Sequence, residues 1–161
     1  MPVRISPIPD GFLERVRADG RDALGQPVRR TVAKGNEPCR DVLRRAAPGE
    51  QLILASFSPF VAEGPYHEYG PVFVLANPSG ETVRRDVLPL HPAPGSSMEP
   101  YLREQFVLRA YSKDESIVGA EMVTAETVSE VLDRFLGSPE VAFVHARFPL
   151  YGCFACRIDR C

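Results

Sequence analysis

Proline decides which parts of this chain can form regular structure. Sixteen of the 161 residues are proline, about twice the usual share of ~5%. Fourteen of them lie at or before residue 100, and only Pro139 and Pro149 follow. Because proline has no amide hydrogen and fixes φ, it interrupts helix interiors and central strands. We therefore expect short elements joined by shaped loops in the first hundred residues.

The overall composition is that of an ordinary globular protein. Hydrophobic residues make up 44% of the chain and charged residues 25%, close to the averages for such proteins. A chain of this length buries roughly 70% of its unfolded surface, so we expect one domain spanning residues 1–161. The net charge of −2 offers no cationic surface to nucleic acid or to a membrane, and we expect neither as a partner.

The sequence lacks a membrane-spanning run and a signal peptide, and we therefore expect a cytoplasmic protein. No apolar run approaches the ~18 residues of a membrane span, and the opening MPVRISPIPDGF lacks the apolar core of a signal peptide. In the cytoplasm the four cysteines stay reduced. No phosphate loop or dinucleotide-binding motif occurs, so no cofactor is expected. The oligomeric state stays open, a homodimer included.

Hydrophobic periodicity predicts an α+β fold. Before residue 100 the expected elements are an edge segment over 1–9, a short helix from Asp10, strands near 28–33, 52–57, 72–76 and 83–88, and a helix over 36–46. After it come strands at 105–111 and 116–122, a helix from Thr124 to Leu136, and strands at 141–147 and 153–159. Direct hairpins favour antiparallel pairing. We predict a single domain of mainly antiparallel sheet with two or three helices packed on it.

The segment EPCR, residues 37–40, carries a candidate catalytic group. Cys39 begins an apolar stripe with the spacing of a packed helix face, continued by Val42, Leu43 and Ala46. In the first turn of a helix, the macrodipole and the neighbouring Arg40 both favour a thiolate. Cys39 is therefore a candidate nucleophile. The alternative is an inert thiol buried with the rest of its stripe.

The loop between the last two strands decides which side chains share a sheet face, since a one-residue slip turns a strand over. A four-residue loop that pairs Phe148 with Cys153 mixes apolar residues with Arg157. A five-residue loop that pairs Arg147 with Cys153 separates them, and unpaired charge in a core is costly. We predict the five-residue loop. Its polar face then carries Phe143, His145, Arg147, Cys153, Ala155, Arg157 and Asp159.

Charged side chains from two strands come together on this polar face. If the 105–111 strand joins the same sheet, Arg109 and Tyr111 lie beside His145 and Arg147. Guanidinium groups hold carboxylate or phosphate through forked hydrogen bonds, and imidazole titrates near neutral pH. We predict a site for a small anionic molecule, with His145 as a catalytic group and the other three as ligand-binding residues. Two alternatives stay open: a solvated sheet face, and a face buried under another element.

The stretch GPYHEYGP, residues 64–71, sets a Gly-Pro pair on each side of four polar residues. Proline fixes the backbone and glycine permits close approach, so the loop loses less entropy when it presents side chains to a ligand. We predict that Tyr66 and Glu68 form a wall of the site, with Arg40 as a further ligand-binding residue and Cys39 close by. The alternative is a hairpin connection whose tyrosines cover the core.

The pair Cys153 and Cys156 has the spacing of a redox or zinc motif. Residues three apart on a strand point to opposite faces, so these thiols are not expected to converge. Zinc normally takes four ligands, and neither this pair nor His67 with Glu68 completes such a set. No metal site is predicted.

Five segments together resemble a bacterial family classed only as domain of unknown function 1203: EPCRDVL, GPYHEYGPVFVLA, FVLRAY, VAFVHARF and GCFACRIDR. The resemblance spans most of the chain and implies a small single-domain cytoplasmic protein with no established activity. The positions that match its motifs are Cys39, Arg40, Tyr66, Glu68, Gly70, Pro71, Arg109, Tyr111, His145, Arg147, Gly152 and Cys153. Relatives often carry a cysteine where this chain has Val42 and a histidine where it has Leu75. These departures argue against a two-thiol or metal mechanism here.

Three functions follow as hypotheses. The favoured one is binding or turnover of a small carboxylate or phosphate at the Arg, His and Tyr cluster on the sheet face. The second is a thiol-dependent enzyme that uses Cys39. The third is a non-catalytic protein-interaction domain with an exposed apolar patch around Val107 and Phe143. Whether the protein is an enzyme stays open.

Overall fold

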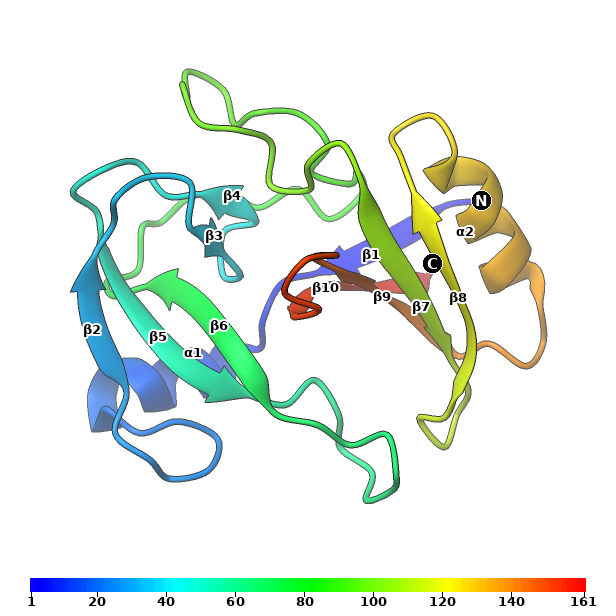
Figure 1. The fold of residues 1–161 in the computed structure, drawn as a ribbon, viewed down its shortest axis with the longest axis horizontal. Helices are drawn as coiled ribbons and strands as arrows, with labels where there is room; N and C mark the ends of the chain where they lie inside the picture. The colour runs from blue at the N-terminus through cyan, green and yellow to red at the C-terminus, as the bar shows by residue number, and fades with distance from the viewer.

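Two five-stranded sheets lie side by side in the computed structural model, which describes residues 1–161 (Figure 1). The first sheet has the strand order β1 (Val3–Ser6), β10 (Phe154–Arg160), β9 (Phe143–Arg147), β7 (Phe106–Tyr111) and β8 (Ile117–Val123). The second has the order β2 (Arg29–Val32), β5 (Gln51–Phe57), β6 (Gly70–Leu75), β3 (Pro38–Cys39) and β4 (Arg44–Arg45). All neighbours are antiparallel except β3 with β6.

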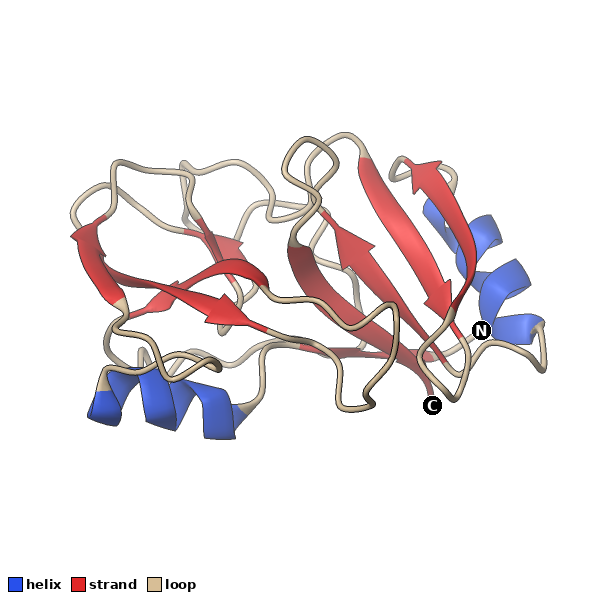
Figure 2. Cartoon of the chain, turned by 60° about the horizontal axis from the view of Figure 1, so that its bottom comes forward, coloured by secondary structure: helices blue, strands red, loops and turns tan.

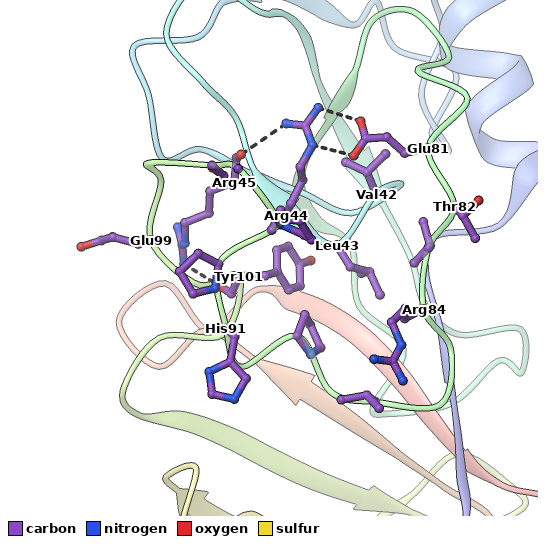
Figure 3. Close-up of a pocket in the computed structure, with 18 of the residues that line it drawn as sticks. Val42, Leu43, Arg44, Arg45, Glu81, Thr82, Arg84, His91, Glu99 and Tyr101 are labelled. Carbon is purple, nitrogen blue, oxygen red and sulfur yellow. Dashed lines mark hydrogen bonds and ion pairs between the residues drawn. The ribbon is translucent and has the colours of Figure 1, made fainter.

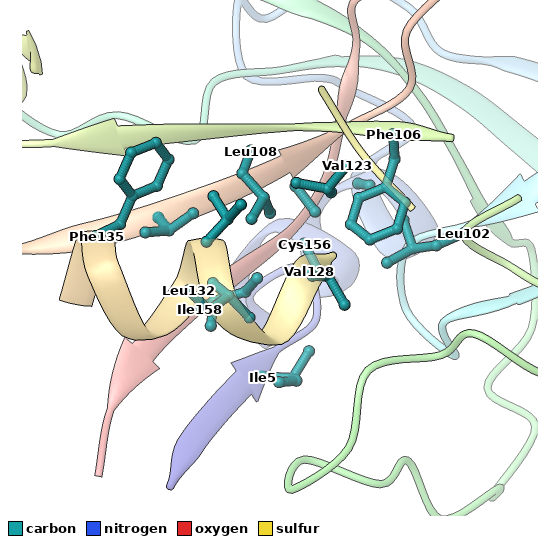
Figure 4. Close-up of a cluster of buried hydrophobic side chains, with 14 of the residues drawn as sticks. Ile5, Leu102, Phe106, Leu108, Val123, Val128, Leu132, Phe135, Cys156 and Ile158 are labelled. Carbon is teal, nitrogen blue, oxygen red and sulfur yellow. The ribbon is translucent and has the colours of Figure 1, made fainter. Parts of the chain in front are cut away.

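One face of the first sheet is covered by α2 (Val128–Gly137), and the main hydrophobic core lies between them (Figure 4). Alternation along β7 places Phe106, Leu108 and Ala110 in this core. The stripe predicted for the helix is buried as a whole: Val128, Val131, Leu132, Phe135 and Leu136. Burying one such Val, Leu or Phe side chain contributes about 1.5–3 kcal/mol, so this face fixes the helix on the sheet.

A second helical segment packs on the second sheet (Figure 2). It consists of α1 (Asp10–Glu14) and a π-helical turn, η1 (Arg15–Asp19). Phe12, Leu13 and Val16 pack there with apolar residues of β5 and β6. One side chain of the first sheet, Phe154, belongs to the same cluster, and its ring lies 5.5 Å from that of Phe57. Phe154 therefore links the two sheets.

The architecture is α+β and mainly antiparallel sheet, with two helices, as the sequence predicted at that level. Strands were expected where β1, β2 and β5–β10 lie, apart from their end residues. Neither helix combines the length and the apolar character that crossing a bilayer requires.

The helix predicted over residues 36–46 is wrong, because the chain forms the short hairpin β3–β4 there. Asn36 and Leu43 have positive φ angles of 71° and 51°, which a right-handed helix does not contain. Pairing with β6 decides the conformation: Cys39 lies opposite Phe73, and Arg40 N donates to Phe73 O at 3.0 Å. Cys39 and Ala46 are still buried together, with Val42 half-buried against them, whereas Leu43 packs in the main core.

The strand predicted near residues 83–88 is also wrong. This segment runs as a loop that meets β1 through a hydrogen bond from Ile5 N to Arg85 O, 2.7 Å long. Prolines at 89, 92, 94 and 100 keep the following chain out of a ladder. Val83 and Leu88 instead pack against the main core from outside.

The hairpin of β9 and β10 pairs Phe148 with Cys153 and so encloses four residues, 149–152, rather than the predicted five, 148–152, between Arg147 and Cys153. Phe148 N donates to Cys153 O at 3.1 Å, and Gly152, with φ 68°, occupies the left-handed position before the strand resumes. A β-bulge lies between Phe154 and Cys156, after which Arg157 pairs with His145. The bulge removes the conflict that a four-residue loop creates: Arg157 stays on the polar face, and Phe154 joins it there.

Candidate functional site

Polar side chains of three neighbouring strands form a row across the face of the first sheet that lies away from α2. Arg109 of β7 is opposite His145 of β9, which is opposite Arg157 of β10. Arg147 lies two positions along β9 on the same face. Directly opposed side chains have Cβ atoms about 4.5–5.5 Å apart. Arginine and histidine from three strands therefore share one space, as the alternation predicted.

Glu68 reaches this face from the loop between β5 and β6. Its Oε1 forms an ion pair with Arg147 Nη2 and lies 3.9 Å from Arg109 Nη1. We call Glu68, Arg109 and Arg147 the Glu68 cluster. Only 4% of the Arg147 side chain is exposed, against 43% of Glu68. The cluster thus has a buried cation beneath an acid that is open to solvent.

Hydrogen bonding within the Glu68 cluster is incomplete. Arg147 Nη1 donates to Gly152 O at 2.8 Å and Nη2 contacts Glu68 Oε1, but the buried Nε has no hydrogen-bond partner. Glu68 therefore pairs with one edge of the guanidinium and leaves the buried Nε without an acceptor. Buried N–H groups that lack an acceptor are destabilising, so this position favours an anion that fits them better.

The loop that carries Glu68 is held in place by two polar anchors. His67 Nδ1 donates to Ala62 O at 2.9 Å, and its Nε2 accepts from Ser58 Oγ at 3.1 Å. Glu115, in the turn between β7 and β8, accepts from Val61 N and Ala62 N at 3.1 and 2.8 Å. Neither flanking glycine of the loop has a positive φ or a close neighbour. The rigidity expected from Gly-Pro pairs therefore comes largely from His67 and Glu115.

His145 lies beside the cluster in a cage of aromatic rings. The ring centroids of Tyr111, Phe60, Phe143 and Phe154 lie 4.8–5.4 Å from that of the imidazole. Burial, and then the charges of Arg147, Arg157 and Arg109, hold the pKa of His145 well below 6.5. The imidazole is neutral at pH 7.

The cage also leaves polar atoms without partners. Neither nitrogen of His145 makes a hydrogen bond, and nor does the Tyr111 hydroxyl. Both side chains are fully buried. The catalytic role predicted for His145 and the ligand contact predicted for Tyr111 have no support in this geometry, because neither side chain reaches the surface.

A cavity of about 180 Å³ adjoins the Glu68 cluster. Glu68 and Arg147 supply its charged side, and Tyr69, Tyr151 and Phe154 lie along its walls. We call it the Arg147 cavity. Its small volume admits a compact ligand, whose charged group would lie against the guanidinium.

Three of the predicted residues lie away from the cluster. Cys39 is buried within β3, where burial raises its pKa to about 12. The prediction of a thiolate favoured by a helix start is wrong, because there is no helix. Tyr66 is exposed on the loop and forms no hydrogen bond or ion pair with the cluster. Arg40 is buried beneath the β9–β10 loop, where its Nη2 donates to Cys153 Sγ at 3.2 Å.

The apolar patch predicted around Val107 and Phe143 is wrong for Phe143. That ring is buried, stacked on Tyr111 at 5.2 Å and covered by the Arg157 guanidinium at 3.9 Å. The four cysteines are free, and Cys156 lies in the main core while Cys153 is partly exposed. No three His, Cys, Asp or Glu side chains come together in a way that could hold a metal.

A larger cavity, of about 810 Å³, lies between the β3–β4 hairpin and the proline-rich segment 81–99 (Figure 3). Its central charge is already neutralised: the Arg44 guanidinium donates to the carboxylates of Glu50 and Glu81 at 2.7–2.8 Å. These hydrogen bonds raise the pKa of Arg44 above its ordinary value. An arginine paired with two acids does not favour an added anion, so we do not place the site here.

Two residues that build the site were not predicted. Phe60 closes the aromatic cage over Tyr111 and His145. Its position after Pro59 in a predicted loop was the only signal, since an apolar ring in a loop often packs inward. Glu115 gave no signal, because the amides that it accepts from are 53 and 54 residues away in the chain.

A family model described as protein of unknown function (DUF1203) matches residues 36–160. The chain belongs to the DUF1203 family. No curated protein and no solved structure matches it. The resemblance seen in five segments is thus confirmed. In this DUF1203 protein the matched range contains the whole Glu68 cluster, whereas β1, α1 and β2 precede it.

Proposed function

We propose that this DUF1203 protein binds a small carboxylate or phosphate at the Glu68 cluster. The anion would lie between Arg109 and Arg147, in the position of the Glu68 carboxylate. The observation that carries the proposal is the buried Arg147 guanidinium, whose Nε has no hydrogen-bond acceptor and whose Nη2 is paired only with the half-exposed Glu68. A planar carboxylate or a phosphate oxygen pair can accept two such N–H groups at once.

Two further features support a ligand in this place. Arg109 is partly exposed, so an anion can reach it from solvent, and Arg147 lies behind it next to the Arg147 cavity. The neutral His145 and its aromatic cage keep water from the back of the cluster. A charged hydrogen bond is stronger where water is excluded.

Glu68 acts in this proposal as an internal competitor. It pairs with Arg147 Nη2 but leaves Arg147 Nε without an acceptor. An incoming anion must displace Glu68. The apparent affinity for the anion is therefore the intrinsic affinity multiplied by the fraction of molecules in which Glu68 does not contact Arg147. The thiol-dependent alternative has lost its physical basis at Cys39, whose raised pKa disfavours the reactive thiolate.

The test is a thermal-shift and calorimetric titration with acetate, lactate and inorganic phosphate. We expect at least one of them to bind, and Glu68→Gln to bind it about five- to tenfold more tightly, because the competing charge is gone. Arg109→Ala should weaken binding about tenfold or more, which is the effect of removing one charge-assisted hydrogen bond.

Arg134→Ala is the matched control. Arg134 is exposed on α2 and pairs with Glu121 of β8, so its removal also breaks one arginine–glutamate pair on the first sheet. Binding should not change in that variant. If every probe that binds does so equally well to wild type, Arg109→Ala and Glu68→Gln, the cluster is not the site.

A further inference from the structure

A second cationic pocket lies on the other side of the β9–β10 loop. It has a volume of about 530 Å³, and Arg40, Arg45 and Phe148 lie along it. We call it the Phe148 pocket. It adjoins the Arg147 cavity only through Pro71, Tyr151 and Cys153, which line both.

Two arginines in this pocket are buried without any acid. Only 2% of Arg40 and 5% of Arg45 is exposed, and neither forms an ion pair. Arg40 donates to the carbonyls of Phe154 and Pro38 and to Cys153 Sγ. Arg45 donates to the carbonyls of Pro100, Asn36 and Tyr101. These acceptors orient the guanidinium groups but carry no full charge to offset theirs.

The positive charge is compensated in part by one ring. The Arg40 and Arg45 guanidinium carbons lie 5.0 and 5.5 Å from the centroid of Phe148. Such cation–π contacts are weaker than pairing with an anion. Burial, and then the charge of Arg103, lower the pKa of Arg45 to about 10, because a buried cation without an acid loses its hydration. Each guanidinium has five N–H groups and donates three of them, so two remain.

The mouth of the Phe148 pocket adds apolar surface and little negative charge. Leu150 and Tyr151 are 92% and 86% exposed there, and Leu54 and Phe73 line the wall. The one acid of the lining, Glu37, accepts the backbone N–H groups of Lys34 and Gly35 at 2.8 Å. Arg103 also lines the pocket and pairs with Glu99.

We propose that the Phe148 pocket binds a small anion joined to a flat apolar group, such as an aromatic carboxylate or phosphate monoester. The anionic group would take the free N–H groups of Arg40 and Arg45, and the apolar part would lie between Phe73 and Tyr151. This site is separate from the Glu68 cluster and does not depend on the function proposed for it.

The experiment is a calorimetric titration with benzoate, phenyl phosphate and the neutral benzamide. We expect one or both anions to bind, and benzamide to bind about tenfold more weakly or not at all, because it lacks the charge. Binding of benzoate alone assigns the pocket to carboxylates, and binding of phenyl phosphate alone to phosphate monoesters. If neither anion binds, or if benzamide binds equally well, the proposal is wrong.

Substitutions at two glutamines test where the ligand binds and leave the buried arginines unchanged. Gln105 is exposed and lines the Phe148 pocket, whereas Gln51 is exposed on β5 outside it. Gln105→Glu should weaken binding of the anion about three- to tenfold, the size expected for one added like charge near solvent. Gln51→Glu should leave it unchanged. Loss of binding in Arg109→Ala, with none in Gln105→Glu, would instead assign the anion to the Glu68 cluster and overturn this proposal.

Discussion

Single residues in this protein are defined by what surrounds them more than by their own chemistry. His145 and Cys39 are both reactive side chains, and both lie in places that suppress ionisation. Arg147 lies next to His145 in the same layer, yet it keeps unfilled hydrogen-bonding capacity at the edge of a cavity. The arginines are therefore the candidate ligand-binding residues, and His145 is a buried residue that packs behind them.

The buried His145 makes stability depend on pH in a defined direction. Its folded-state pKa lies well below 6.5, so below pH 6.5 the unfolded chain takes up a proton that the folded protein does not. The unfolding free energy should therefore fall as pH decreases from 6.5 towards the folded pKa, by about 1.4 kcal/mol per pH unit at most. Urea unfolding at pH 7.5, 6.5 and 5.5 measures this slope.

His145→Phe keeps a ring in the cage and removes the titrating group. We expect a flatter pH dependence between pH 7.5 and 5.5, even if the larger ring lowers stability at every pH. His91→Ala removes an exposed imidazole from the proline-rich segment and is the matched control. An unchanged slope in His145→Phe would show that other groups cause it.

At the scale of elements, local patterns identified the strands and helices that have a clear and sustained hydrophobic periodicity. The alternation of β7 and the stripe of α2 are of this kind, and both were predicted. The helix prediction for residues 36–46 was wrong because the conformation of this segment is decided by pairing with β6, more than thirty residues later. The loop length predicted for β9–β10 was wrong because it assumed an unbroken strand. The bulge between Phe154 and Cys156 shifts the alternation by one residue and keeps Arg157 on the polar face with a four-residue turn.

The candidate site was predictable to the same extent. Alternation in two strands predicts that Arg109 and His145 share a face once both strands lie in one sheet, but their direct pairing does not follow from it. The entry of Glu68 between two arginines, and the depth at which His145 lies, do not follow from it, because they depend on the Phe60 ring and on a loop held by Glu115.

The loop of residues 58–69 should loosen when its anchor in the β7–β8 turn is removed. Glu115→Ala leaves the N–H groups of Val61 and Ala62 without their acceptor, while the adjoining strands keep their ladder. We expect faster hydrogen exchange at these two amides and faster proteolysis within the loop. The neighbouring Lys113→Ala is the control, since Lys113 is exposed in the same turn. Equal exchange in both variants would contradict the role given to Glu115.

At the scale of the whole molecule, two sheets with separate helices are joined through a few side chains. Phe154 extends from β10 into the cluster under α1, where its ring lies 5.5 Å from that of Phe57. Arg40 and Arg45 add hydrogen bonds across the same boundary. Both proposed sites lie along this boundary, so the packing of the sheets sets their shape.

Phe154→Ala should weaken the junction as well as the core. We expect a loss of about 3–5 kcal/mol in unfolding free energy, the usual range for truncating a buried Phe. Phe135→Ala truncates a buried ring of α2 within the first sheet's core and is the control of similar size. Hydrogen exchange distinguishes them: Phe154→Ala should expose amides of β5 and β6, and Phe135→Ala should not. Equal protection of those strands in both variants would rule out the link.

The strand order of the first sheet also has a consequence for how the chain folds during synthesis. The second sheet uses residues 29–75, so its strands can pair before the rest of the chain exists. By contrast, β1 pairs only with β10, across almost the full length of the chain. Contacts this distant slow folding, and unpaired strand edges invite aggregation. The interval before β10 emerges from the ribosome is when the nascent protein is most vulnerable.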